Sequence, residues 1–252
     1  YDGRSKNKTI KYNFNGVFNH NITNKELFNQ IIENNIMNNL SCFMYGQTGS
    51  GKTHTVIGKS SDEGIFILTG KKLIEKNLEL NLSAYQIYND DIYDLLNSNT
   101  KLKLLEDKNN NFQIPNLEEI QVNQIEDLYE CLKIIKSNRT ESANNVNMQS
   151  SRSHAVFIFK FYHQYEVITI KIIDLAGNER SANSKILCLK SRLENKHINY
   201  SLFSLKECIR NIDKGRRHIP FRRSKLTSVL RDCFISNHKS IMISTICSNN
   251  SF

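Results

Sequence analysis

The stretch Gly46-Gln47-Thr48-Gly49-Ser50-Gly51-Lys52-Thr53 decides how the rest of the chain is interpreted. It satisfies the pattern G-x-x-x-x-G-K-[ST] in full. The apolar run Ser41–Tyr45, which predicts a buried strand, comes directly before it, and a helical start follows it. In such a loop the glycines let backbone N–H groups curl around a phosphate, and the helix N-terminus adds partial positive charge. A glycine-rich loop that binds nothing is the alternative, and the strand–loop–helix context argues against it.

The end of this loop (the P-loop, Gly46–Thr53) predicts a nucleoside triphosphate and its metal ion. The Lys52 ammonium would reach the β- and γ-phosphates, and the Thr53 hydroxyl would bind Mg²⁺. A guanine-specific enzyme should also carry an Asn-Lys-x-Asp motif that binds the guanine base. The Asn-Lys pairs that begin at Asn7, Asn24 and Asn195 have no Asp at the required place. We therefore expect ATP and Mg²⁺ as cofactors.

Two further segments have the composition of sensors for the terminal phosphate. An apolar run leads into Asp174, a position that steadies Mg²⁺ and its waters, and Gly177 could bring a backbone N–H against the γ-phosphate. Upstream, Asn147–His154 is a polar, hydroxyl-rich stretch that runs into a predicted strand. Either segment alone would also fit an ordinary turn or a solvated loop. Together with the P-loop, in this order, they predict a nucleoside-triphosphate hydrolase.

The composition is that of a globular chain. The 252 residues include 39% hydrophobic and 23% charged residues, which excludes wholesale disorder, and the length suffices to bury a core. No apolar run approaches the roughly 18–20 residues of a membrane helix, and no signal-peptide pattern opens the chain. The six cysteines are scattered, without a C-x-x-C pair or a His at metal-ligand spacing. We expect inert thiols and a soluble protein of a reducing, intracellular compartment.

Predicted strands and helices alternate along the chain. We predict strands at Lys8–Phe14, Ser41–Tyr45, Leu80–Tyr88 and Ala155–Asp174, the last with a hairpin break near His163–Glu166. We predict helices at Gly64–Lys76, Ile125–Ser137, Lys196–Ile212 and Ser224–Cys233, and one opened by a Thr23–Glu26 capping box with an apolar face of Leu27, Phe28, Ile31, Ile32 and Ile36. The triplet Asn109–Asn111 predicts a loop tip. With no internal repeat and no Pro/Gly/Ser-rich linker, the pattern indicates one α/β domain with a central sheet.

The three phosphate-site segments together resemble the P-loop, switch I and switch II of kinesin motor domains. The matching text is Gly46–Thr53, Asn147–His154 and Asp174–Arg180, and agreement extends from Tyr12–Asn15 to His218–Arg222. The resemblance implies a P-loop NTPase-type fold, with a mixed, mostly parallel β-sheet flanked by helices on both faces. It also implies an ATPase whose ATP hydrolysis is stimulated by microtubules or tubulin.

The resemblance assigns catalytic and metal-binding roles residue by residue. Ser151 matches the switch I hydroxyl that joins Thr53 on Mg²⁺, and Asp174 would act on the ion through water. Asn147 and Ser150 match positions beside the γ-phosphate, where Gly177 would also approach.

Two further roles concern the ion pair between the switch segments and the contact with adenine. Arg152 and Glu179 match a switch I–switch II ion pair that closes when ATP is bound and helps to organise the attacking water. Such a pair is a two-state contact, because it forms only when both loops close on the γ-phosphate. His54 matches a position that packs on the adenine, although a histidine there could equally be a surface residue at the start of a helix.

The basic surplus of the chain is concentrated near its C-terminal end. Asp213–Lys225 (the basic segment) holds six Lys or Arg and one Asp, so it carries +5 of the net charge of +9. Such a block is often solvated or binds nucleic acid, but no zinc, helix-turn-helix or aromatic RNA-binding pattern supports nucleic acid. By resemblance the segment faces the acidic surface of tubulin, to which long-range attraction would speed encounter and weaken with salt. We expect tubulin as the partner, with no nucleic acid and no membrane.

Local sequence similarity favours the kinesin-13, microtubule-depolymerising class over translocating kinesins. The similar stretches are Asn178 within switch II, Leu104–Asp107, Lys206–Arg210 and Val229–Asp232. In that class the motor bends tubulin at the microtubule end in its ATP state. The expected tubulin-binding residues are Lys206, Glu207, Cys208, Arg210, Lys214, Arg216, Arg217, His218, Arg222, Arg223, Lys225 and Arg231. For Cys208 the alternative is a small apolar helix residue that faces the core. A translocating kinesin and a microtubule-binding module with a vestigial ATPase are the other functional interpretations.

Some positions depart from the family pattern. By resemblance, residues 1–252 form a single motor domain that lacks the family's first strand, its Arg-x-Arg-Pro segment and its last helix. Tyr200 replaces a lysine, Arg223 replaces a small residue, and Ser181–Ser184 replaces a glycine-rich continuation. We expect the isolated domain to be a monomer in the cytoplasm, on the microtubule cytoskeleton and the spindle.

Overall fold

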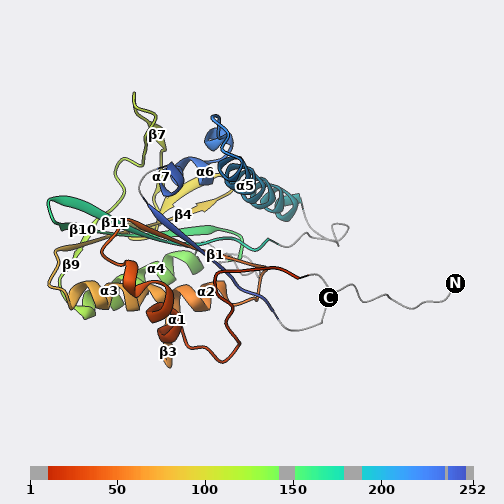
Figure 1. The fold of residues 1–252 in the computed structure, drawn as a ribbon. Coiled ribbons are helices and arrows are strands. Elements are labelled where there is room, and N and C mark those ends of the chain that lie inside the picture. Colours follow the sequence, from red (N-terminus) through yellow and green to blue (C-terminus); the bar gives the residue numbers. More distant parts are fainter. Residues whose placement is uncertain (1–10, 142–150, 179–188, 236–237, 248–252) are drawn as a thin grey trace, which may run out of the picture.

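The computed structural model describes residues 11–141, 151–178, 189–235 and 238–247. In this part of the chain a central β-sheet lies between two layers of helices (Figure 1). None of the helices found among these residues is long and apolar enough to cross a membrane.

The sheet is mixed. Its order is β12–β1–β11–β10–β4–β5–β6, and β9 also pairs with β4. The bounds are β1 Leu40–Tyr45, β4 Leu80–Tyr88, β5 Asp91–Asp94, β6 Lys101–Leu102, β9 Ile120–Val122, β10 His154–His163, β11 Glu166–Asp174 and β12 Lys239–Ser244. β1 pairs in parallel with β11 and β12, and the remaining neighbours pair antiparallel. Consequently β12, β1, β11, β4 and β6 point one way, and β10, β5 and β9 the other. The expected mixed sheet, with most strands in one direction, is confirmed.

Helices cover both faces of this sheet (Figure 1). One layer contains α1 Asn24–Ile31, α2 Lys52–Ile57, α3 Ile65–Ile74 and α4 Ile125–Glu141, and the other contains α5 Leu189–Asp213, α6 Lys225–Val229 and α7 Asp232–Ile235. Short elements join them: the 3₁₀ turns η1 Glu33–Asn35 and η3 Phe221–Arg223, the ribbon β2 Gly58–Lys59 with β3 Asp62–Glu63, and the hairpin β7 Leu105–Glu106 with β8 Phe112–Gln113.

Each face of the sheet has its own hydrophobic core because side chains alternate along a strand. On β1, Cys42 and Met44 pack with the α1–α4 layer, whereas Phe43 packs with the α5–α7 layer. In the first core the rings of Phe66 and Phe157 lie 5.4 Å apart between centroids. In the second, Phe43 stacks on Phe234 at 5.5 Å. Burial of both faces explains why the strand before the P-loop is predominantly apolar.

Several sequence predictions are confirmed. The strand Leu80–Tyr88 has the predicted bounds, and the hairpin β10–β11 turns between His163 and Glu166. The capping box of α1 is present, since Thr23 Oγ1 accepts from the Glu26 N–H and the Glu26 carboxylate accepts from the Thr23 N–H. Leu27 and Phe28 of α1 are buried and Ile31 is partly exposed, whereas the buried Ile32 and Ile36 lie beyond the end of this helix, at its C-cap and after η1. The triplet Asn109–Asn111 lies in the turn between β7 and β8, as predicted.

Two predictions were wrong where they fall on described residues. Residues 11–14 are not in a strand: Tyr12 is 73% exposed and Phe14 62%, so the alternation there has no buried face to stabilise a ladder. Lys8–Ile10 lie outside the described residues. The helix predicted at Ser224–Cys233 is two short helices, because Leu230 adopts φ −95° and ψ 2°, which interrupts the helical hydrogen bonds between α6 and α7.

Candidate functional site

The P-loop runs from the end of β1 to the start of α2, and two of its glycines are required by geometry. A Cβ on Gly46 would lie 2.5 Å from the Thr245 carbonyl oxygen, so no side chain fits there. Gly51, the N-cap of α2, has φ +103°, a backbone conformation that favours glycine. The loop is also fixed by a hydroxyl contact, because Ser50 Oγ lies 2.7 Å from Thr245 Oγ1.

The lysine of the P-loop lies inside the loop. Lys52 is 6% exposed, and its Nζ donates to the carbonyl oxygens of Gly46 at 2.9 Å and Gln47 at 2.8 Å. A cation held at the centre of a curled backbone is the arrangement that the predicted contact with β- and γ-phosphates requires. The remaining predicted loop residues, Thr48 and Gly49, belong to the same turn.

A buried carboxylate lies beside the first turn of α2. Asp174, at the end of β11, is 1% exposed, and its Oδ2 accepts from Thr53 Oγ1 at 2.8 Å and from the Arg139 guanidinium at 3.2 Å. Its Oδ1 is buried and has no hydrogen-bond partner among the described residues. A carboxylate oxygen left unsatisfied next to a threonine hydroxyl fits a hydrated Mg²⁺ ion, whose waters would supply the missing donors. The residues present therefore fit the expected ion.

The two switch segments contact each other, and switch II also contacts the P-loop. The Gly177 N–H donates to the Ser151 carbonyl oxygen at 2.9 Å, and the Asn178 N–H donates to the Gly46 carbonyl oxygen at 3.3 Å. Contact of Gly177 with a γ-phosphate would therefore exchange this bond to Ser151 for one to the phosphate. Of the other predicted residues, Asn147, Ser150 and Glu179 lie outside the described residues.

The switch I arginine contacts a carboxylate that sequence analysis did not identify. An Arg152 guanidinium nitrogen lies 2.5 Å from Glu194 Oε2, and the Tyr88 hydroxyl donates to Glu194 Oε1 at 2.5 Å. Glu194 lies in the second turn of α5 and Tyr88 ends β4, so the cluster joins a helix, a strand end and switch I. The predicted pairing of Arg152 with Glu179 stays a prediction.

A buried histidine makes a second connection to α5. The Ala176 N–H donates to His154 Nδ1 at 3.0 Å, so the proton is on Nε2, which donates to Ser201 Oγ at 2.8 Å. Burial, and then the nearby charge of Lys52, lowers the pKa of His154 from 6.5 to about 3. The neutral ring therefore connects the start of β10 to switch II and to α5 throughout the physiological pH range.

Sequence analysis missed Arg139, His154, Glu194 and Tyr88 as parts of the site. Arg139 and Glu194 follow no local pattern, because each is a charged residue on a helix that becomes buried only when that helix packs on the sheet. His154 ends the predicted switch I segment Asn147–His154, for which the sequence indicated a role only at other positions. The available signal for His154 was its position at the start of a predicted strand, directly after the hydroxyl-rich stretch.

The residue predicted to contact adenine lies at the edge of the site. The His54 side chain is 39% exposed, and its Nε2 lies 4.0 Å from Asp62 Oδ2. The Asn24 side-chain amide donates to the His54 carbonyl oxygen at 3.1 Å and attaches this turn of α2 to the start of α1. A role of His54 in stacking on a base stays a prediction.

Most of the residues predicted to bind tubulin lie on one exposed surface beyond the second core. Lys206, Arg210, Lys214, Arg216, Arg217, His218, Arg222 and Arg223 are exposed, and Glu207, Lys225 and Arg231 are partly exposed. The prediction was wrong for the Cys208 side chain, which is fully buried. Its position on α5 turns it toward the sheet, so burial raises the pKa of this thiol to about 11 and it behaves as a core residue.

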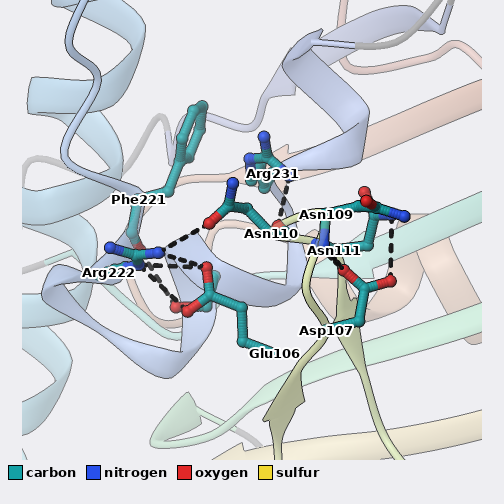
Figure 2. A network of polar contacts seen from close by, with 9 residues as sticks. Glu106, Asp107, Asn109, Asn110, Asn111, Phe221, Arg222 and Arg231 are labelled. Atoms are coloured by element: carbon teal, nitrogen blue, oxygen red, sulfur yellow. Dashed lines mark hydrogen bonds and ion pairs between the residues drawn. The ribbon is translucent and has the colours of Figure 1, made fainter.

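Part of the positive charge on this surface is neutralised within the molecule. Arg222 makes a forked contact with the Glu106 carboxylate, 2.7 Å from Nη2 to Oε1, and also reaches Asn110 (Figure 2). The Lys225 ammonium lies 3.1 Å from Asp91 Oδ1. Among the described residues, Lys214, Arg216, Arg217 and Arg223 have no ion-pair partner. Of the six cations in the basic segment, these four therefore remain available to an external acidic partner.

The β7–β8 hairpin is fastened to this surface by its tip. A guanidinium nitrogen of Arg231, between α6 and α7, donates to the Asn110 carbonyl oxygen at 2.5 Å (Figure 2). The tip itself is ordered by Asp107, whose Oδ1 accepts from the Asn109 and Asn111 N–H groups. The hairpin, the end of α5 and the basic segment together line an open depression of about 650 Å³.

These features define a class of protein. A P-loop at the end of one strand, a buried aspartate at the end of its parallel neighbour and two loops hydrogen-bonded across them are the parts of a P-loop nucleoside triphosphatase. The family model described as "Kinesin motor domain" matches residues 1–252. The chain belongs to the kinesin motor-domain family.

Individual relatives agree with this assignment. The chain is 41% identical over 218 residues to human "Kinesin-like protein KIF24" and 40% identical over 216 residues to the mouse protein of that name. Each alignment covers 82% of this chain but only 16% of the relative. The structure is similar, with a TM-score of 0.85 and 27% identity, to a solved structure described as that of a fast kinesin, with implications for ATPase mechanism and interactions with microtubules. That match covers 96% of this chain and 75% of the other.

Membership of the family determines the general activity. Kinesin motor domains bind ATP with Mg²⁺, associate with microtubules and are microtubule-stimulated ATPases. The P-loop, Asp174 and the switch segments are the residues of this chain that the sequence predicts for this activity.

Proposed function

We propose that the chain is an ATP-dependent microtubule motor that couples ATP hydrolysis to microtubule depolymerisation. One observation carries the proposal. Three segments resemble the depolymerising class in sequence: Leu104–Asp107, Lys206–Arg210 and Val229–Asp232. They are far apart along the chain, yet all three contribute residues to the depression of about 650 Å³. A class-specific difference in tubulin contact would be expected where such segments meet on one exposed surface.

Within the nucleotide site, each residue has a task that its position supports. Lys52 would bind the β- and γ-phosphates, with the P-loop glycines leaving room for the backbone to approach them. Thr53 and Ser151 would hold Mg²⁺ directly and Asp174 through water. The bound ion supplies charge neutralisation for the transferred phosphoryl group.

The switch residues would then orient the attacking water. Asn147, Ser150 and Gly177 would lie against the γ-phosphate, and Arg152 with Glu179 would close over it. Because this closure needs both switch segments, a change in either one alters the rate of hydrolysis rather than only the affinity for ATP.

The exposed outer face of α5 supports tubulin as the partner. Leu193, Tyr200 and Phe203 are each at least half exposed and recur at helical spacing, and Lys196 and Lys206 lie exposed among them. An apolar stripe with cations beside it fits an acidic protein surface, since the apolar residues provide contact area and the cations provide attraction. We propose that this face and the basic segment bind tubulin on cytoplasmic microtubules, including those of the spindle.

Imaging of stabilised microtubules tests the proposal. With the parent protein we expect shortening from the ends in ATP or a non-hydrolysable analogue, and none in ADP. A Lys52→Ala variant, which cannot bind the phosphates, should leave microtubule length unchanged in every nucleotide. Intact microtubules with parent protein in the ATP state would refute depolymerisation.

The similarity to the fast kinesin favours a second candidate, a translocating motor. A gliding assay distinguishes the two, because a translocating kinesin moves microtubules steadily without shortening them. A third interpretation, a microtubule-binding module with a vestigial ATPase, predicts that microtubules leave ATP turnover unchanged and that Glu179→Ala behaves like the parent.

A further inference from the structure

The N-terminal part of α5 contacts switch I through one buried carboxylate. Glu194 is 6% exposed, and both of its oxygens are used: Oε1 accepts from the Tyr88 hydroxyl and Oε2 from the Arg152 guanidinium, each at 2.5 Å. A carboxylate held at both oxygens has a single orientation, so the guanidinium that it binds is also fixed.

The two partners of Glu194 lie at one end of the sheet. Tyr88 is the last residue of β4, and Arg152 lies two residues before the start of β10, which pairs with β4 through His154 and Ile87. The Tyr88 side therefore belongs to the rigid sheet, whereas Arg152 belongs to switch I. Burial, and then the hydrogen bond to Glu194, raises the pKa of Tyr88 to about 12, so the hydroxyl remains a donor at physiological pH.

The opposite face of the same helix turn is exposed. Leu193, the neighbour of Glu194, is 57% exposed and belongs to the outer stripe with Tyr200 and Phe203. A displacement of α5 by a partner on that stripe would carry the Glu194 carboxylate with it, because a helix moves as a rigid element. The second connection, from Ser201 through His154, would move in the same sense.

We propose that Glu194 is a positioning residue for ATP hydrolysis, which holds the Arg152 guanidinium at the end of the sheet from a helix whose other face is open to tubulin. The tubulin part of this inference rests on the proposed function. Glu194 acts through Arg152 and contacts no reacting atom. Its removal should therefore alter turnover without altering the cradle that binds the phosphates.

The test compares Glu194→Gln with a matched control. Glu119→Gln removes the same charge from an exposed ion pair with Lys160, 2.9 Å apart, which lies about 20 Å along β10 from switch I. In Glu194→Gln we expect the basal kcat, measured without tubulin, to fall about tenfold, with the KM for ATP within about twofold of the parent. Glu194→Asp, which keeps the charge, should recover part of the rate, and Glu119→Gln should match the parent.

Two further measurements separate positioning from a general loss of structure. In an Arg152→Ala background, Glu194→Gln should change kcat less than about twofold, because a residue that acts through Arg152 has no effect once Arg152 is gone. In the nucleotide-free Glu194→Gln variant, hydrogen exchange should be faster than in the parent around Ser151 and at the Gly177 amide. It should stay unchanged in the rest of β10.

A kcat within twofold of the parent in Glu194→Gln would overturn the proposal. So would a full rate loss that persists in the Arg152→Ala background, or a uniform rise in exchange along β10 with a lowered melting temperature. Microtubule cosedimentation and microtubule-stimulated turnover are measured in parallel. A parent that neither binds microtubules nor responds to them would refute the proposed function, while the basal rates would still decide the role of Glu194.

Discussion

The Arg139–Asp174 pair makes a sharp test of how the nucleotide site is held together. Arg139 is 4% exposed and Asp174 1%, and the guanidinium lies 3.2 Å from the carboxylate. Replacement by Met in Arg139→Met removes the cation and keeps a similar apolar length. The Asp174 charge would then remain buried with the Thr53 hydroxyl as its one remaining donor among the described residues, which should lower the free energy of unfolding by about 3–5 kcal/mol. That is a large fraction of the about 5–15 kcal/mol of a typical domain.

Urea unfolding, followed by circular dichroism, measures this change. The matched control is Lys160→Met, which breaks the exposed Lys160–Glu119 pair, with both side chains 41% exposed, and should cost less than about 1 kcal/mol because solvent screens that pair. In Asp174→Asn/Arg139→Met both charges are absent, so the double variant should be more stable than the sum of the single effects predicts. A loss in Arg139→Met no larger than that of the control would refute the idea that this pair is held out of water.

Three other predictions follow from the same structure. Gly46→Ala forces a Cβ to within 2.5 Å of a backbone carbonyl, so it should destabilise the domain and abolish nucleotide binding, measured by fluorescent ADP titration; unchanged ADP affinity would contradict the close packing. Arg216→Ala/Arg217→Ala/Arg223→Ala should weaken microtubule cosedimentation and flatten its salt dependence, with basal ATP turnover unchanged as the internal control. The pKa of His154 is lowered to about 3, so between pH 6.5 and 3 the unfolded chain binds more protons and the parent loses up to about 1.4 kcal/mol per pH unit as pH falls. His154→Gln should lose less stability over this window in urea titrations, and an equal slope would contradict the buried neutral ring.

Local sequence was sufficient to predict the structure wherever neighbours in the chain determine the chemistry and the spacing. The P-loop needs glycines at Gly46 and Gly51 for reasons of backbone geometry, and a lysine at a set distance from them. Buried strands are recognisable in a sequence as largely apolar runs. For this reason Leu80–Tyr88 was predicted with its observed bounds. The same applies to the capping box at Thr23, whose hydrogen bonds span three residues.

Local sequence failed where the partner is remote. The alternation at residues 11–14 is typical of a strand, but no strand in the described part of the chain pairs with it, and its aromatic residues stay exposed. The resemblance placed Cys208 among the tubulin-binding residues, with a core residue as the alternative, and the packing of α5 on the sheet buries it. The basic segment was treated as one block of charge, although Glu106 and Asp91 on other elements neutralise two of its cations.

The sequence by itself determined that this chain is a P-loop nucleotide hydrolase of the kinesin type, because phosphate binding depends on a short, contiguous stretch of backbone and side chains. Only the tertiary structure decided which carboxylates, cations and hydroxyl groups share a buried environment. Packing places Arg139 on Asp174, and Glu194 between Tyr88 and Arg152. The electrostatic energy of such groups depends on distance and burial rather than on sequence separation, so no local pattern specifies these contacts.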